Sequence, residues 1–281
     1  YSLLKPEIVA PGELIQSAKM GTGSDGAWFN GSSLSTPHVA GAAALALQAH
    51  PDWNATEIKA LLLNTANPIH HESGLVYPES LAGAGFLDVA QAVNTYVTVM
   101  AEGSDGLTTL SLGALAISEP FKITKEIRIT NHSDSPVSFE MDVEQTVKET
   151  GFSVEIPQDR SVHLQANSHK LIQVSFHADP TQFDRIGDSI TPNTINGRTR
   201  SWIYEASGKI RFHGEGNTLR IPYHAVVRSA AEKKTTINKI GLPNKDSVIL
   251  NLPLKGNSAH PKPLASVFEL AAISPRNSNL K

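Results

Sequence analysis

Residues 31–41 place several hydroxyl side chains directly before an apolar helix. Ser or Thr occupies four of the five positions between Gly31 and Pro37, and residues 39–49 are almost wholly apolar. The first turn of a helix has unpaired backbone N–H groups and a partial positive charge. Such groups can stabilise the oxyanion that forms when a serine attacks a carbonyl. We therefore predict that Ser33 is a nucleophile and that its own N–H is an oxyanion donor.

The same residues also predict how this helix begins and packs. We expect Pro37 to lie in its first turn, where a missing N–H leaves no hydrogen bond unmade. Residues 39–47 have no polar face, so we expect the helix to be buried on all sides. Ser and Thr are also favoured N-caps, and a simple capping cluster is the alternative interpretation of the hydroxyl side chains.

The sequence of residues 31–41 resembles the nucleophile signature of subtilisin-like serine proteases, Gly-Thr-Ser-Met-Ala-Thr-Pro-His-Val-Ala-Gly. Ser33 falls on the nucleophile of that signature. The departures are Ser32 for threonine, Leu34 for methionine and Ser35 for alanine, and none removes a group that the chemistry needs. The resemblance implies a serine endopeptidase that hydrolyses protein or peptide substrates through an acyl-enzyme on Ser33. It also implies that His38 is structural and is not the general base.

Two flanking segments resemble the same family. The family's Lys-Pro-Asp-Ile-Val-Ala-Pro-Gly strand, which precedes the nucleophile loop, is similar to residues 5–12, and its Gly-Ala-Gly segment is similar to residues 83–88. Between them, Asn54 and Glu57 form an N-cap pattern for a helix. A further helix is expected at residues 89–97 from its apolar spacing. The resemblance implies that residues 1–100 are the C-terminal part of a subtilisin-like α/β domain.

A serine protease also needs a base, an acid that orients it, and a second oxyanion donor. In the resembled family the Asp, the His and the oxyanion Asn all precede the nucleophile, so here they would lie before Tyr1. Asp25 and Asn30 are too close to Ser33 in sequence to match them. We expect the chain to belong to a longer protein whose N-terminal part is its partner, and to be inactive alone.

Composition excludes several functions and leaves cofactors unassigned. The net charge of −3 and the pI near 6.4 provide no basic stripe for nucleic acid. No apolar run is long enough to span a membrane, and the absence of cysteine excludes disulfides and a thiol nucleophile. His70 and His71 are adjacent and lack the spacing of a helical zinc site. No cofactor is identifiable; calcium and a secreted or cell-surface location are implied only by the resemblance.

A change in composition near residue 100 predicts a domain boundary. Residues 1–100 contain three Lys and no Arg, and the later residues hold the other 21 basic side chains. From there apolar residues alternate, which predicts an antiparallel β-sandwich over residues 101–228. Residues 125–133 resemble the fibronectin-III-like domain of large secreted subtilisin-like proteases. Residues 229–281 are expected to form a linker and the start of a further β module, with one strand at 248–252.

Other features of the sequence suggest three alternatives to a protease. A phosphate-binding loop at residues 21–26 lacks the Gly-Lys-Ser/Thr ending. An α/β-hydrolase needs Gly-x-Ser-x-Gly, and residues 31–35 end in serine. The third alternative is a non-catalytic binding or adhesion module with a relic protease segment. The sequence upstream of Tyr1 would discriminate it from a protease, since a protease needs Asp and His blocks there.

Overall fold

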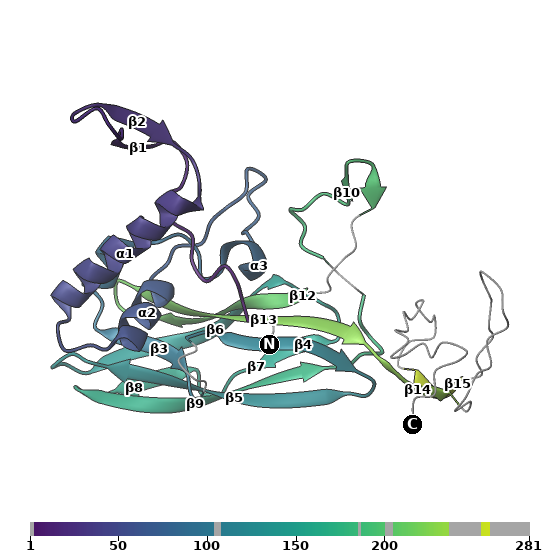
Figure 1. Cartoon of the computed structure of the whole chain (residues 1–281). Coiled ribbons are helices and arrows are strands. Elements are labelled where there is room, and N and C mark those ends of the chain that lie inside the picture. Colours follow the sequence, from purple (N-terminus) through teal and green to yellow (C-terminus); the bar gives the residue numbers. More distant parts are fainter. Residues whose placement is uncertain (1–2, 104–107, 185–186, 200–204, 236–253, 259–281) are drawn as a thin grey trace, which may run out of the picture.

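The computed structural model describes residues 3–103, 108–184, 187–199, 205–235 and 254–258. The chain is mostly β-strand, in antiparallel and mixed sheets, with few helices (Figure 1). We refer to residues 3–96 as the N-terminal segment, which carries all the helices of the described residues, and to residues 97–229 as the β body. None of these helices is both long and apolar enough to span a membrane.

Two sheets make up the β body. The five-stranded sheet has the order β4-β13-β12-β6-β8, and the four-stranded sheet has the order β3-β5-β9-β7. Their bounds are β3 Val97–Ala101, β4 Leu110–Ile117, β5 Phe121–Asn131, β6 Val137–Val147, β7 Phe152–Glu155, β8 Ser161–Leu164, β9 Ser168–Ala178, β12 Glu205–His213 and β13 Thr218–Ser229. One hydrophobic cluster draws residues from both sheets, so the sheets share a core.

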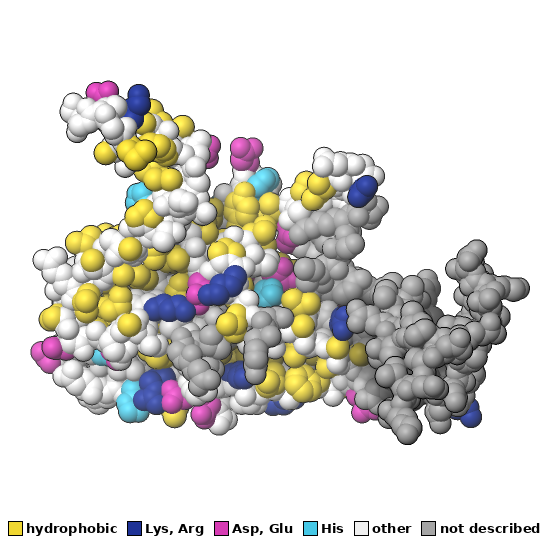
Figure 2. All heavy atoms as spheres, viewed as in Figure 1, with side chains coloured by type: hydrophobic (Ala, Val, Ile, Leu, Met, Phe, Trp, Pro, Cys, Tyr) yellow, Lys and Arg dark blue, Asp and Glu magenta, His cyan; other side chains and the backbone are white. Residues whose placement is uncertain are grey.

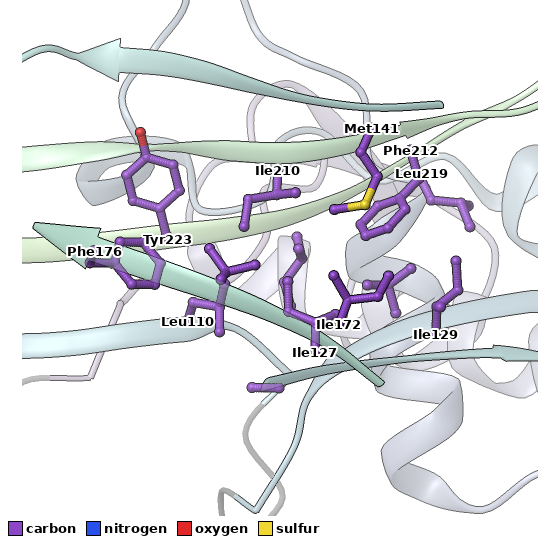
Figure 3. Packing of buried hydrophobic residues seen from close by; sticks show 14 of the residues in the cluster. Leu110, Ile127, Ile129, Met141, Ile172, Phe176, Ile210, Phe212, Leu219 and Tyr223 are labelled. Atoms are coloured by element: carbon purple, nitrogen blue, oxygen red, sulfur yellow. The ribbon is translucent and has the colours of Figure 1, made fainter. Parts of the chain in front are cut away.

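Alternation along the strands places the core side chains. In β5, Ile127 and Ile129 are fully buried, whereas the residues between and before them are more exposed. Phe176 of β9 lies 5.6 Å from the ring of Tyr223 in β13, which brings the two sheets together (Figure 3). Burial of each such side chain stabilises the fold by about 1.5–3 kcal/mol. The alternating apolar residues that predicted strands here are therefore the residues that face the core.

The prediction of a wholly antiparallel body was wrong at one pair. Strand β4 runs parallel to β13, with Tyr223 opposite Leu110. The next strand along the chain, β5, belongs to the other sheet, so no tight hairpin fixes the direction of β4. Two smaller pairs are separate from the two main sheets: β10 (Thr194–Ile195) with β11 (Arg198–Thr199), and β14 (Ala231–Thr235) with β15 (Leu254–Ser258). The strand predicted at 248–252 lies outside the described residues.

The N-terminal segment contains one hairpin and four helices. The hairpin joins β1 (Ile15–Ala18) to β2 (Gly26–Phe29). The helices are α1 (Ser32–Ala49), α2 (Ala55–Asn64), α3 (Glu79–Ala82) and α4 (Val89–Val93). The strand predicted within residues 5–12 is reduced to an isolated parallel bridge between Val9 and Phe86. The helix predicted to reach Val97 stops at Val93, because Val97 is taken into β3 opposite Asn131.

Helix α2 follows its sequence prediction closely. The Asn54 side chain accepts hydrogen bonds from the N–H groups of Thr56 and Glu57, and the Glu57 carboxylate accepts one from the Asn54 N–H. This reciprocal capping box is therefore confirmed. The apolar side chains of Ile58, Leu61 and Leu62 in the helix, and of Ala66 just after it, are all buried.

Helix α1 contradicts the prediction of burial on all sides. Its only buried residues are Ala42 and Ala46, whereas Leu45 is 51% exposed and Leu47 is 46% exposed. Its packing partners in the described chain are α2 and α4. The absence of a polar face predicts that a helix is covered on all sides. It does not show whether this chain has enough elements around the helix to cover it.

Gly85 is held in a tight backbone crossing. Its carbonyl accepts from the Val9 N–H, and its φ of +129° is one that side chains rarely adopt. A Cβ added at Gly85 would overlap the backbone of Asn67. The Gly-Ala-Gly sequence therefore lets the segment around Val9 and the segment around Asn67 approach the same short stretch of chain.

We predict that Gly85→Ala lowers the free energy of unfolding by about 3 kcal/mol or more, because backbone strain of about 1–3 kcal/mol adds to the overlap with Asn67. The control is Gly74→Ala, which has a φ of +83° but open space around it. Gly74→Ala should cost only about 1–2 kcal/mol. Urea unfolding of both variants measures the difference, and equal losses would contradict this account of Gly85.

A stack of rings joins the end of α1 to the β body. The Trp53 ring lies 4.2 Å from His50, just after α1, and 4.1 Å from His132, just after β5. His50 also meets the edge of Tyr96, and His132 Nε2 lies 3.1 Å from the Thr98 hydroxyl. Burial lowers the pKa of His50 and of His132, although the Glu57 carboxylate opposes the shift at His132.

These lowered pKa values predict loss of stability in mild acid. The unfolded chain binds protons at its histidines below about pH 6.5, and the folded chain takes them up only at lower pH. Stability should therefore be complete above about pH 6.5 and fall as the pH drops towards 5. Thermal melts at pH 7.5 and 5.5 measure it. His132→Phe keeps a ring against Trp53 and should reduce the pH dependence; an unchanged dependence would contradict the assignment.

Candidate active site

Ser33 is the second residue of α1 and is exposed. Gly31 is the N-cap, with φ 145° and ψ 158°, and its carbonyl accepts from the Leu34 N–H at 3.0 Å. No side chain caps this helix, so capping does not explain the cluster of hydroxyl residues. Within the described residues, the Ser33 hydroxyl has no hydrogen-bond partner, and the N–H groups of Ser32 and Ser33 have no acceptor.

Two hydrogen bonds hold the loop before Ser33 against the segment before β1. The Gly31 N–H donates to the Gly12 carbonyl at 2.7 Å, and the Leu14 N–H donates to Asn30 Oδ1 at 2.6 Å. A Cβ at Gly12 would overlap the Ser35 hydroxyl, which shows how closely the two segments approach. The sequence analysis compared Asn30 with the family's oxyanion asparagine and did not predict this contact, because nothing in the local pattern identifies Leu14 as its partner.

Pro37 does not lie in the first turn, as the sequence analysis expected. The helix begins at Ser32, so Pro37 is its sixth residue and lies in the second turn. The N–H of residue 37 would normally donate to the carbonyl of Ser33, four residues earlier, and proline has none. The hydroxyl-rich residues before Pro37 are themselves helical, and the Ser33 carbonyl is left without its usual helical donor.

The other candidate residues are engaged elsewhere. His38 Nδ1 lies 2.7 Å from the Leu34 carbonyl, one turn back in the same helix. Asp25 lies at the end of the β1–β2 turn, where its N–H donates to the Thr22 hydroxyl. His71 Nδ1 accepts from the Ser73 N–H in an exposed loop. In the described part of the chain, no histidine or carboxylate is bonded to Ser33, and no three metal-ligating side chains gather.

The site thus contains an accessible hydroxyl, free N–H groups beside it and a loop fixed by two hydrogen bonds. Such an arrangement can present a nucleophile to a carbonyl and can stabilise negative charge on its oxygen. Among the described residues it has no group that removes the serine proton.

Comparison with known proteins identifies the first third of the chain. Residues 1–86 match the model of the subtilase family. Minor extracellular protease Vpr of Bacillus subtilis (strain 168) is 37% identical over 99 residues, which are 32% of this chain and 12% of that protein. Subtilisin-like protease SBT4.3 of Arabidopsis thaliana is 28% identical over 179 residues, 54% of this chain and 24% of that protein.

One solved structure similar to part of the chain is the ASH / PapD-like domain of human CEP192. The similarity covers 48% of this chain and 87% of that domain, with 12% sequence identity and a TM-score of 0.28.

The first part of the chain is thus similar to subtilases, and the relatives named here are proteases. The similarity to the subtilase family lies in residues 1–86. The chain spans only 12% and 24% of the lengths of the two curated relatives.

Proposed function

We propose that this chain is part of a serine endopeptidase in which Ser33 is the nucleophile. The Ser33 oxygen attacks the scissile carbonyl while a base takes its proton, and the resulting tetrahedral oxyanion collapses to an acyl-enzyme. The C–N bond breaks, and the leaving amine receives the proton. Water then hydrolyses the ester and restores the serine. The observation that supports this most directly is the exposed, unbonded Ser33 hydroxyl beside free N–H groups at the start of α1.

The base, its orienting acid and a second oxyanion donor are proposed to come from an N-terminal part of the same catalytic domain. The uncovered apolar surface of α1 supports this (Figure 2). A groove of about 600 Å³ between α1 and α2 is lined mostly by apolar residues, among them Val39, Leu47, Trp53 and Leu62. Exposed apolar patches of this kind are typical of surfaces that another polypeptide covers. The occupant we propose is the upstream part of the subtilisin-like α/β domain.

The finer domain assignments are also proposals. Residues 1–100 are assigned to the C-terminal part of the catalytic domain, 101–228 to a fibronectin-III-like domain and 229–281 to a linker and a further module. Strand β3 begins at Val97 and pairs with β5, so the β body includes residues 97–100 as well. Protein or peptide substrates and a secreted or cell-surface location belong to the same proposal.

We predict that Ser33 reacts with a fluorophosphonate probe in a full-length protein that includes the family's upstream residues, and that this chain alone does not react. A serine hydroxyl is a weak nucleophile until a base removes its proton. Ser33→Ala should abolish labelling and peptide hydrolysis. Peptide mapping by mass spectrometry identifies the labelled residue.

Ser35→Ala is the matched control, because the family signature itself has alanine there, and it should retain most of the activity. Labelling at Ser32 or Ser35, or full proteolysis by the Ser33→Ala variant, would contradict the assignment. A full-length protein whose upstream part lacks Asp and His would instead favour the binding module with a relic protease segment.

We also predict that residues 97–229 fold alone and melt cooperatively, since the core cluster that joins the two sheets lies wholly within them. Differential scanning calorimetry of this fragment should give a single transition with equal calorimetric and van't Hoff enthalpies. A broad melt would show that the β body depends on the N-terminal segment for its stability.

A further inference from the structure

Asn64, the last residue of α2, makes three hydrogen bonds to the backbone of the β body. Its Nδ2 donates to the carbonyls of Val99 and Arg220, each at 2.9 Å, and its Oδ1 accepts from the Val99 N–H at 2.8 Å. The side chain is completely buried. A buried amide of this kind is costly unless it is paired, and here three of its four possible hydrogen bonds are made.

The partners of Asn64 are backbone groups that the sheets leave open. Strand β3 is at the edge of its sheet and pairs only with β5, where Val99 lies opposite Ile129. In an antiparallel strand the N–H and the carbonyl of one residue point to the same side, so both groups of Val99 face away from β5. Arg220 pairs with Arg211 on one side, and the pairing of β13 with β4 on the other side begins only at Tyr223. The Asn64 amide therefore bridges the open edges of both sheets.

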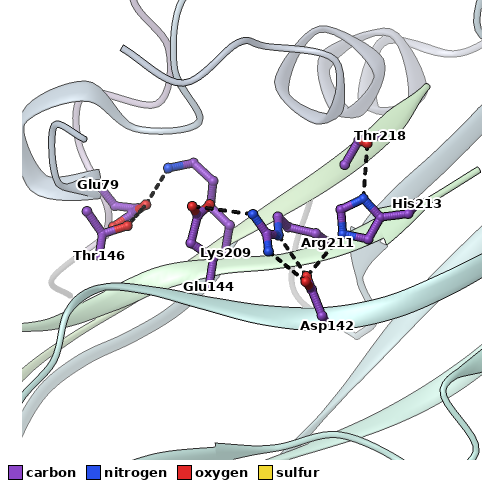
Figure 4. A network of polar contacts seen from close by, with 8 residues as sticks. All are labelled: Glu79, Asp142, Glu144, Thr146, Lys209, Arg211, His213 and Thr218. Atoms are coloured by element: carbon purple, nitrogen blue, oxygen red, sulfur yellow. Dashed lines mark hydrogen bonds and ion pairs between the residues drawn. The ribbon is translucent and has the colours of Figure 1, made fainter. Parts of the chain in front are cut away.

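Helix α3 adds a second polar link to the β body. The Glu79 carboxylate forms an ion pair with Lys209 of β12 at 2.5 Å and accepts a hydrogen bond from Thr146 of β6 at 3.0 Å (Figure 4). The side chains of Glu79 and Lys209 are 0% and 1% exposed. Next to Glu79, the Ser80 hydroxyl donates to the Glu205 carboxylate at 2.7 Å. These contacts fix the N-terminal segment on the five-stranded sheet.

Packing connects Asn64 to the nucleophile. Ile58, Leu61 and Leu62 of α2 form one hydrophobic cluster with Ala42 and Ala46 of α1. Helix α2 contacts β3 and β13 of the β body, and α1 contacts α2 and α4. The position of α1, and so of Ser33 at its start, therefore depends on where α2 is held.

We infer that Asn64 is a positioning residue: by bridging the two sheet edges it holds the α1–α2 pair, and with it Ser33, against the β body. The structural half of this inference, that Asn64 holds α1 and α2 against the β body, rests on the contacts alone. The half that concerns Ser33 rests on the proposed function.

Hydrogen exchange of the full chain tests the structural half. Asn64→Leu keeps a similar volume and removes all three hydrogen bonds; Asn64→Asp keeps the oxygen acceptor and removes both donated bonds. Loss of such partners should raise amide exchange in α1 and α2 by about 10- to 100-fold in Asn64→Leu. The rise in Asn64→Asp should be at least as large, because its buried carboxylate faces the carbonyls of Val99 and Arg220. Exchange in β9 and β12 should stay unchanged.

Asn94→Leu is the control, since Asn94 is an exposed helix-end asparagine whose side chain, among the described residues, bonds only to the Ala90 carbonyl. It should leave exchange in α1 and α2 unchanged. Unchanged exchange in Asn64→Leu would overturn the inference, because the three hydrogen bonds would then not hold α1 and α2. An equal rise of exchange in the β body would also overturn it, because Asn64 would then affect only the stability of the whole fold.

Labelling kinetics in the full-length protein test the half that concerns Ser33. The fraction of protein that the fluorophosphonate labels measures how many molecules have a reactive site. The rate constant of labelling measures how well Ser33 is positioned in those molecules. Asn64→Leu should slow the rate constant by about tenfold or more, as expected when a supporting shell is loosened. A smaller labelled fraction with an unchanged rate constant would overturn positioning. No labelling of the unmodified protein would overturn the proposed function and, with it, this role of Asn64.

Discussion

The buried ion pair between Glu79 and Lys209 sets a strict constraint on the structure. Both side chains are almost fully removed from solvent, although they belong to different parts of the chain, α3 and β12. Removing one partner of such a pair leaves an uncompensated buried charge, which costs about 3–5 kcal/mol. The N-terminal segment can therefore lie on the five-stranded sheet only in an orientation that keeps this pair together. An apolar contact of the same area would restrict its orientation far less.

Sequence patterns predicted those features whose causes are local. Alternation predicted most strands of the β body, because residues two apart face the same core, and the capping box at Asn54 predicted the start of α2. Features that depend on distant partners were not predictable. Val97 continues an apolar helical spacing, yet it pairs with Asn131 in a sheet, and β4 takes its direction from β13, more than a hundred residues away. The predicted burial of α1 failed for the same reason.

The candidate site divides in a similar way. The residue types and the spacing around Ser33 pointed to a nucleophile at a helix start, and the structure has that serine at the second position of α1. The contacts that fix its loop, between Gly31 and Gly12 and between Asn30 and Leu14, join segments about sixteen to nineteen residues apart. No local rule links those segments, since the intervening hairpin decides their distance. The structure was needed to show that Pro37 lies inside α1 and leaves the Ser33 carbonyl without its usual helical donor, because the sequence analysis placed Pro37 in the first turn.

The two sides of the α1–α2 pair differ in chemistry. Towards the β body, α2 and the residues that follow it present buried polar groups with matched partners, such as Asn64 against Val99 and Glu79 against Lys209. Away from it, α1 presents Leu45, Leu47 and an apolar groove. A satisfied polar contact specifies one orientation, whereas an apolar surface favours any cover of complementary shape. Under the proposed function the polar side anchors the nucleophile and the apolar side receives the polypeptide with its base. Anchoring and activation would then act on opposite sides of the same two helices.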